Sequence, residues 1–217
     1  MGSTKLISKD VAEIDAKLKT FNSPMVKIEF LENCLKQMIP NDAARFCHLQ
    51  LADLYAQRLM YGPAAKQMES AADTAVTFKD KISFYMKEVV FAIKINDYLI
   101  VDKASKKALM CVNTSAEKEI VKNTLKGEMM AQAREHELKN KRSNAAQIYE
   151  RLITMTITNE EEKKSLIAKV AELNSKLGRL KEAIRYEQML KRPIEMKRDP
   201  ETDVKRVSFN DLGLEEL

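Results

Sequence analysis

The chain has 217 residues, a length that suits one or two compact domains or one short solenoid. With 45% hydrophobic and 32% charged residues, it has enough apolar material for a core and enough charge for solubility. The net charge of +5 is mildly basic, but the excess is not clustered in the sequence, which argues against nucleic acid as the partner.

Cysteine usage and the absence of long apolar runs indicate a soluble protein of a reducing compartment. The cysteines are Cys34, Cys47 and Cys111, an odd number without a CxxC spacing, so we expect buried thiols and not a disulfide scaffold or metal site. No apolar run approaches the ~20 residues of a membrane span, and the first residues do not form a signal peptide. The expected location is the cytoplasm.

Composition and breakers predict an all-α chain. Alanine, leucine, lysine, glutamate and methionine dominate, and these residues favour helices over strands. Ser23 before Pro24, Pro40, Gly62 before Pro63, and Gly178 mark joints between helices. We predict ten helices, near residues 8–20, 24–39, 42–60, 63–77, 80–97, 99–113, 115–140, 143–156, 159–177 and 179–191.

Two further helix starts have the pattern of a capping box, with a carboxylate three residues after the cap. These are Thr114 with Glu117 and Thr158 with Glu161. The predicted loops have only two to four residues, which forces consecutive helices to run antiparallel. The ten helices therefore predict five α-hairpins in series.

Pairs of alanines twelve residues apart indicate an internal repeat. The first members of the four pairs are spaced 40, 41 and 38 residues apart, and a fixed period of this size is typical of a helical repeat array. The pairs are Ala52/Ala64, Ala92/Ala104, Ala133/Ala145 and Ala171/Ala183.

Residues around these pairs resemble a tetratricopeptide repeat. The turn with Gly62 and Pro63, and the unit from Lys176 through Gly178 to Ile184, resemble its turn and second helix. The resemblance covers residues 43–191, although the unit near Ala92 lacks the turn glycine. The period of about 40 exceeds the ~34 residues of a standard unit and implies longer helices, as in the tetratricopeptide-like superhelices of vesicle-attachment and scaffold proteins.

The resemblance implies a right-handed superhelix of about five antiparallel hairpins, a tetratricopeptide-like α-solenoid, over residues 1–192. Residues 8–40 would form a degenerate first hairpin that caps one end, since a terminal repeat must present a solvated face. Residues 193–217 would form a flexible or self-docking C-terminal tail. The alternative fold is a closed α-helical bundle in which the alanines are in phase by chance.

No catalytic constellation is evident. His48 and His136 lie 88 residues apart in different repeats, and we interpret both as ordinary helix residues. Cys47 follows Phe46 on an apolar helix, which is typical of a core position. The motifs of phosphate-binding loops, zinc proteases, nucleophile elbows and dinucleotide folds do not occur. We therefore expect a non-enzyme without a cofactor or a metal.

The resemblance implies a concave binding face built from the first helix of each hairpin. The asparagines that clamp the carboxylate end of a chaperone tail are absent, so an amphipathic helix or extended peptide with apolar anchors is the expected ligand. The alternative is that Phe46, Met86, Val89 and Ile93 are buried between hairpins. The residues expected on this face are Phe46, Leu49, Asp53, Gln57, Met86, Val89, Ile93, Asn96, Asp97, Met130, Arg134, Glu137, Ala168, Glu172 and Lys176.

The tail after Pro193 combines charge with regularly placed apolar residues. We predict that Val207, Phe209 and Leu212 dock, either on the concave face of the same chain or on a partner. Residues 205–209 also resemble the docking motif of type-1 protein phosphatase regulators, which anchors through alternating apolar residues in an added strand.

The sequence thus predicts a scaffold or adaptor that binds a protein or peptide segment. An alternative is an RNA- or ribosome-associated helical protein that uses Lys139, Lys141 and Arg142 with scattered lysines; steep salt dependence of RNA binding would favour it. A third interpretation is a structural module that forms a homo-oligomer.

Overall fold

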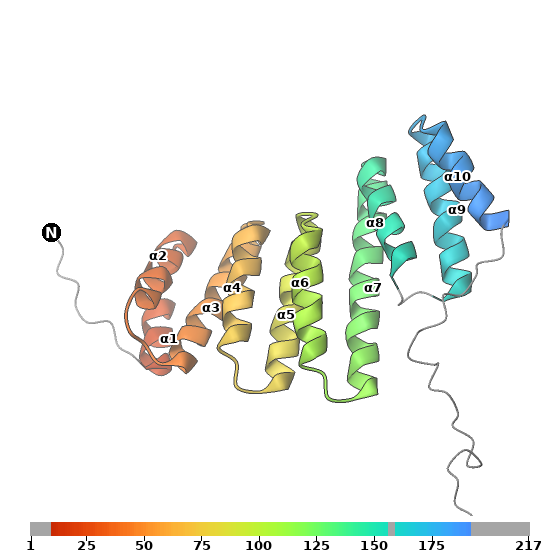
Figure 1. Ribbon diagram of the computed structural model, residues 1–217. Coiled ribbons are helices and arrows are strands. Elements are labelled where there is room, and N and C mark those ends of the chain that lie inside the picture. The colour runs from red at the N-terminus through yellow and green to blue at the C-terminus, as the bar shows by residue number, and fades with distance from the viewer. Residues whose placement is uncertain (1–9, 156–158, 192–217) are drawn as a thin grey trace, which may run out of the picture.

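Ten α-helices form the described part of the chain, which is residues 10–155 and 159–191 of a computed structural model (Figure 1). These residues contain no β-strand. The helices are α1 (Val11–Lys19), α2 (Pro24–Leu35), α3 (Asn41–Gln57), α4 (Tyr61–Asp73), α5 (Phe78–Lys94), α6 (Tyr98–Met110), α7 (Ser115–Leu138), α8 (Arg142–Thr154), α9 (Glu160–Lys176) and α10 (Leu180–Lys191).

The helices pack in chain order. From α2 onward each helix contacts the next one, and Figure 1 shows them as a row with α1 and α2 at one end and α9 and α10 at the other. The all-α class and the sequential packing of ten helices are confirmed, and the row is not closed into a compact bundle.

Polar side chains cap the N-terminal ends of α1, α5, α6, α7 and α9. Thr114 accepts from the backbone N–H of Glu117 at 3.1 Å, and the Glu117 carboxylate accepts from the Thr114 backbone in return, so this predicted capping box is confirmed. The second box starts one residue later than predicted, with Asn159 and Glu162 as the reciprocal pair. A side-chain oxygen thereby satisfies helix N–H groups that have no partner within the helix.

One type of turn joins the two helices of each of the hairpins α3–α4, α5–α6, α7–α8 and α9–α10. In each turn one residue adopts a positive φ between 56° and 73°, and the next N–H donates back to a carbonyl five residues earlier at 2.8–3.0 Å. The residues with positive φ are Leu59, Asn96, Asn140 and Gly178. These turns show that the hairpins are built on one pattern.

The turns define the register of the repeat. In every hairpin the residues seven before and five after the left-handed position are small and buried, with no more than 5% exposure. These pairs are Ala52/Ala64, Val89/Val101, Ala133/Ala145 and Ala171/Ala183.

The pair Ala92/Ala104, predicted for the second hairpin, is therefore wrong by three residues. The second hairpin has valine at both small positions and Asn96 in place of a turn glycine, so an alignment on alanine and glycine misplaces it. The correction changes which residues of α5 are equivalent to the face residues of the other first helices.

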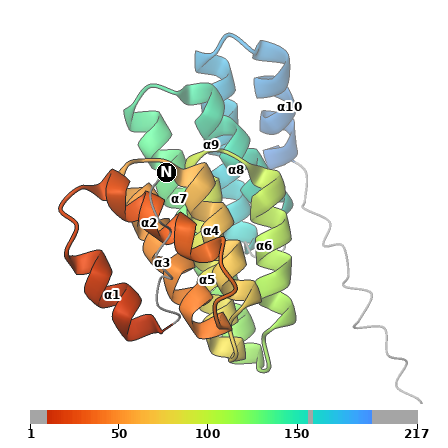
Figure 2. The same cartoon turned by 90° about the vertical axis from the view of Figure 1, so that its left-hand side faces the viewer.

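The N-terminal end differs from the prediction of a fifth hairpin. Both α1 and α2 pack against α3, and α1 contacts α3 more than it contacts α2. Figure 2 shows α1 at the outer end of the row, beside α2 and α3. Only Ile14 and Leu18 of α1 are buried, which is too little apolar surface to form a complete packed pair.

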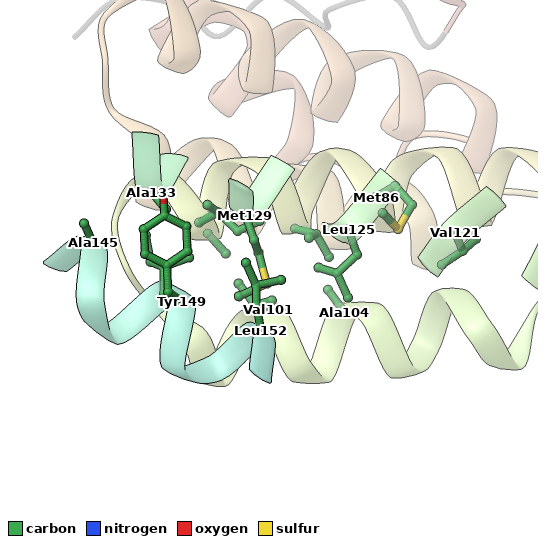
Figure 3. Close-up of a cluster of buried hydrophobic side chains, with 14 of the residues drawn as sticks. Met86, Val101, Ala104, Val121, Leu125, Met129, Ala133, Ala145, Tyr149 and Leu152 are labelled. Atoms are coloured by element: carbon green, nitrogen blue, oxygen red, sulfur yellow. The ribbon is translucent and has the colours of Figure 1, made fainter. Parts of the chain in front are cut away.

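Helix α5 packs directly against both α6 and α7. Met86 and Val89 of α5 belong to one buried cluster with Leu125 and Met129 of α7. Figure 3 shows Met86 and Leu125 converging with Ala104 of α6 in this cluster. The inner side of α5 is thus core and not an open face.

A second buried cluster joins α2, α3 and α4 and includes Cys34 and Cys47, both free thiols. Burial raises the pKa of the Cys34 thiol, and burial together with the neighbouring Cys34 raises the pKa of Cys47 to about 12. These two cysteines are therefore unreactive at neutral pH, as expected from the sequence, whereas Cys111 is only half-buried.

Glu88 of α5 is a carboxyl group inside the core, with only 2% of its surface exposed. Its Oε2 atom has no hydrogen-bond partner in the described residues. Burial, with the nearby carboxylate of Glu69, raises the pKa of Glu88 to about 7, although Lys107 and Lys103 oppose the rise and Asp73 adds to it. Because the folded state holds this proton more tightly than the unfolded chain, stability falls as the pH rises from about 4.5 through 7.

We predict that Glu88→Gln removes this dependence. The variant should be more stable than the parent at pH 8, by about 3 kcal/mol, and close to it at pH 4.5, because the pKa of Glu88 lies at about 7 instead of 4.5 and each unit of that difference is about 1.4 kcal/mol. Urea unfolding at both pH values measures this. Glu13→Gln, at an exposed position of α1, is the control, and an equal gain at both pH values in Glu88→Gln would contradict the prediction.

The shared turn gives a second prediction. Gly178→Ala should lower the free energy of unfolding by about 1 kcal/mol, because alanine is strained at a φ of 73° although open space surrounds the site. Gly127→Ala, on the exposed side of α7 with similar open space, should raise it by about 0.5–1 kcal/mol. Leu59→Gly should also stabilise, because Leu59 is 72% exposed and holds a φ of 61°. Thermal unfolding of the three variants decides whether the signs are as stated.

Candidate functional site

An open cleft of about 630 Å³ lies between the first helices of the last two hairpins, α7 and α9. We call it the α7–α9 cleft. Met130 and Leu166 provide apolar surface in its walls, and charged side chains stand beside them. Its lining residues are Met130, Arg134, Glu137, Leu138, Tyr149, Ser165, Leu166, Ala168, Lys169 and Glu172.

The cleft exists because α8 lies between α7 and α9. Helix α8 packs against both of them, whereas direct packing of a first helix on the next one is seen between α5 and α7. Tyr149 of α8 lines the cleft although it is only 3% exposed. The α7–α9 cleft thus runs between two first helices that are separated by α8, whereas α5 and α7 are in direct contact.

A chain of polar contacts crosses the cleft. The Tyr149 hydroxyl donates to Glu137 Oε1 at 2.6 Å, and Lys169 Nζ lies 2.9 Å from Glu137 Oε2. Lys169 is also 3.6 Å from Glu172, which forms a further ion pair with Lys176 one turn away. These contacts connect α7, α8 and α9 and fix the position of the Glu137 carboxylate.

The pKa shifts agree with this chain of contacts. Burial, and then the hydrogen bond to Glu137, raises the pKa of the Tyr149 hydroxyl, so this group stays a donor at neutral pH. The Glu137 carboxylate raises the pKa of Lys169, and Lys176 followed by Lys169 lowers the pKa of Glu172. All three groups therefore keep their ordinary charge state near pH 7.

Two cationic side chains line the cleft, Lys169 and Arg134, and Arg134 takes no part in these contacts. It is exposed, one turn from Met130 and from Leu138 on α7, and forms no hydrogen bond or ion pair with the described residues. A guanidinium beside apolar surface can bind a carboxylate through two parallel hydrogen bonds. The cleft can therefore hold an acidic group next to an apolar one.

A smaller hollow of about 140 Å³ extends the cleft toward the N-terminal end of α9. Met130, Ser165 and Leu166 line both spaces. Lys126 Nζ lies 3.0 Å from both carboxylate oxygens of Glu162, an ion pair that links α7 to α9 at this end. The two hollows together form one groove along the two helices.

Five of the residues predicted for the binding face line the cleft: Met130, Arg134, Glu137, Ala168 and Glu172. Lys176 lies at its end, where it pairs with Glu172 but does not line the hollow. The structure thus brings together the predicted residues of the third and fourth hairpins.

The residues predicted from α5 do not join them. Met86, Val89 and Ile93 are at most 9% exposed, so this part of the predicted face is wrong and the alternative of burial between hairpins holds for them. Direct packing of α5 on α7 buries them. Asn96 lies in a turn with its carboxamide oxygen 3.1 Å from His136, and Asp97 caps α6. With the corrected register, Val90 and Lys94 take the places of the predicted Ile93 and Asp97.

The predicted residues of α3 lie away from the cleft. Phe46 and Leu49 are half-buried, and Phe46 packs against the cluster around α2 and α3. Asp53 and Gln57 are exposed. The tail residues Val207, Phe209 and Leu212 lie outside the described residues.

Five lining residues were not predicted: Leu138, Tyr149, Ser165, Leu166 and Lys169. Leu138 follows the small residue Ala133 by five places, as Gln57 follows Ala52, so applying that offset to the third hairpin would have found it. Tyr149 is on a second helix, and no sequence signal shows that it reaches the opposite face. Lys169 follows Ala168 directly in the sequence. Its position in the cleft depends on its ion pair with Glu137, which joins α9 to α7 and has no signal in the sequence.

Neither histidine lies in the cleft. His48 Nδ1 is 2.7 Å from Gln67, and His136 is buried beside Asn96 and Gln132. No group of three or more His, Cys, Asp or Glu side chains that could hold a metal occurs within residues 10–155 and 159–191. Over the same residues, no helix is long and apolar enough to cross a membrane.

The fold and the cleft define an all-α protein of serial helical hairpins with a groove between two first helices. No protein-family model matches the chain, and no curated protein matches it.

Proposed function

We propose that this protein is a non-catalytic scaffold or adaptor that holds a segment of another protein. In this proposal its hairpins are tetratricopeptide-like and wind as a right-handed superhelix, with the first helices on the concave side. The repeated left-handed turns and the small buried pair in each hairpin support that architecture. The buried free thiols of Cys34 and Cys47 fit a reducing, cytoplasmic location.

The observation that carries the proposal is the α7–α9 cleft. It is a groove with apolar surface from Met130, Leu138 and Leu166 and with one cation, Arg134, that lacks an ion pair in the described residues. Exposed apolar surface next to an unpaired charge has no evident role in the stability of an isolated chain. A bound partner segment would cover the apolar surface and give Arg134 a carboxylate partner.

The geometry fits a short amphipathic segment. From Glu162 to Glu172 the groove follows α9 for ten residues, or about 15 Å, because a helix rises ~1.5 Å per residue. That length accommodates about three turns of a helix or four to five extended residues. The segment would place an apolar side chain against Met130 and Leu166 and an acidic side chain against Arg134.

Site-specific photo-crosslinking from Ala168 tests the proposal. Ala168 is exposed in the wall of the cleft, and Ala116, exposed at the start of α7, is the matched control position. In the cell that expresses the chain, the probe at Ala168 should crosslink to a partner segment that mass spectrometry can locate, and the probe at Ala116 should not. Equal labelling from both positions, or none from Ala168, would reject the cleft as the binding site.

We predict that Arg134→Glu weakens binding of a synthetic peptide with the crosslinked sequence at least tenfold. A charge-assisted hydrogen bond contributes about 1.5–3 kcal/mol, and in the variant the new glutamate would in addition repel the acidic side chain of the peptide. Lys106→Glu, at an exposed position of α6, makes the same change in charge outside the cleft and should leave the affinity for the peptide within twofold of the parent. Fluorescence anisotropy measures both, and equal loss in the two variants would show that only net charge matters.

We also propose that the C-terminal tail occupies the cleft when no partner is bound. Residues 192–217 lie outside the described residues, but α10 runs antiparallel to α9 and ends toward the Glu162 end of the groove. Twenty-six residues can reach about 85 Å when extended, far more than the 15 Å of the groove. The segment from Phe209 to Leu217 contains four apolar side chains and three acidic ones, which complements the groove around Arg134.

Deleting residues 197–217 should therefore raise the affinity of the full-length protein for the same peptide about three- to tenfold, because the peptide no longer competes with the tail. The control is a tail in which Phe209, Leu212 and Leu214 are replaced by serine, which should give the same gain without shortening the chain. Unchanged affinity in both variants, together with unchanged proteolysis of the tail in the serine variant, would reject this arrangement.

A further inference from the structure

The four turns that close the hairpins lie together along one edge of the molecule, the upper edge in Figure 1. We call residues 57–62, 94–99, 138–143 and 176–181 the turn edge. It carries eight basic residues and one acidic residue, so its charge of +7 exceeds the +5 of the whole chain. The basic residues are Arg58, Lys94, Lys139, Lys141, Arg142, Lys176, Arg179 and Lys181, all exposed.

The opposite ends of the hairpins are different. The loops 36–41, 74–79 and 111–116 together hold two basic residues, Lys36 and Lys79. The fold therefore concentrates on one edge a positive charge that is scattered along the sequence. The expectation that nucleic acid is not a partner depended on that scatter.

Most of these cations have no carboxylate partner within the described residues. Lys139 pairs with Glu135 and Lys176 with Glu172, but the other six form no ion pair there. The one acidic residue, Asp97, accepts from the backbone of Ile100 at 3.2 Å as the cap of α6. The turn edge thus presents an unbalanced row of positive charge.

Helix stability does not explain where several of these cations lie. A lysine at the C-terminal end of a helix, such as Lys94, interacts favourably with the helix dipole. Lys141 and Arg142 instead lie at the N-terminal end of α8, and Lys181 in the first turn of α10, where positive side chains add to the positive end of the dipole. Neither α4 nor α8 has a side-chain cap at its N-terminus. Free N–H groups and cations therefore coincide, and both are ligands for anions.

A hollow of about 340 Å³ opens on the turn edge, and its charged lining residues are Lys94, Lys139, Lys141 and Glu135, the last of which pairs with Lys139. His136 also lines it, is 5% exposed, and has an Nδ1 atom without a partner in the described residues. Burial and the nearby Lys141 lower the pKa of His136, so the ring is neutral and the lysines provide the charge. The hollow is large enough for a phosphate group.

We propose that the turn edge binds nucleic acid through the phosphates of its backbone, without reading bases. Each hairpin contributes at least one cation to the row, which suits a polymer with a charge on every unit. Exposed apolar residues do not favour a lipid surface instead, because they occur at both ends of the hairpins, for example Leu59 on the turn edge and Val76 and Phe78 opposite. This surface is separate from the α7–α9 cleft and from the peptide binding proposed there.

The test uses the full-length protein and a fluorescein-labelled 20-nucleotide poly(U) RNA, followed by fluorescence anisotropy. The edge variant changes Lys141, Arg142 and Lys181 to Glu. The matched control changes Lys36, Lys79 and Lys118 to Glu, with the same change in net charge at exposed positions away from the turn edge. The edge variant should remain at least as stable as the parent, because glutamate suits the N-terminal ends of α8 and α10.

We expect the parent to bind with a log–log salt slope of about −3, as for four to five phosphate contacts to a single strand. The edge variant should bind at least tenfold more weakly and with a slope closer to zero, and the control variant should bind within threefold of the parent. Arg134→Glu should leave RNA binding within twofold while it weakens peptide binding, so failure of one proposal is distinguishable from failure of the other.

Equal loss of RNA binding in the edge and control variants would overturn the proposal, since only net charge would then matter. Displacement of the RNA by a 20-residue polyglutamate at the same charge concentration would also overturn it, in favour of an acidic protein partner. The same holds if the parent binds vesicles of 30% phosphatidylserine and does not bind RNA.

Discussion

Each hairpin depends on one backbone residue in the left-handed region, because this residue reverses the chain within a single turn. The turn fixes where the second helix starts, so the residues seven before and five after it meet the same packing requirement in every hairpin. It also makes all first helices run in one direction and all the turns lie on one edge. The close small pairs, the shared face and the charged turn edge are consequences of this constraint.

The turn is the same in the four hairpins, but the contacts between neighbouring hairpins differ. Between α5 and α7 the first helices touch, and their apolar side chains merge into one core. Between α7 and α9 the second helix α8 intervenes, and Tyr149 and the Glu137–Lys169 pair take the place of direct packing. The same repeated unit thus gives core at one junction and an open groove at the next, and the difference comes from a few side chains and not from the turn.

The helices and their order could be predicted from the sequence because each depends on local signals: periodic apolar residues, caps and breakers. The register of the second hairpin could not, because Val89 and Asn96 fill positions that elsewhere hold alanine and glycine. Arg134 and Glu172 were found by their spacing in the repeat. Met86 is buried in the core, whereas Met130 lines the groove. This difference depends on how far apart neighbouring first helices lie, and that distance is set by long-range packing, which no local sequence pattern encodes.

Helix α7 has the open groove on one side and close-packed side chains of α5 on the other. Because only one side of α7 is closely packed, the two walls of the groove differ in how easily they can move. Pushing α7 away from α9 would press Leu125 and Met129 into the side chains of α5, and a close-packed core resists such overpacking. Displacing the hairpin α9–α10 disturbs chiefly its contacts with α8 and the ion pairs across the groove. The mechanical compliance of the groove therefore lies in its last hairpin, so a change in the width of the groove would move α9 and α10 while the first eight helices act as a fixed wall.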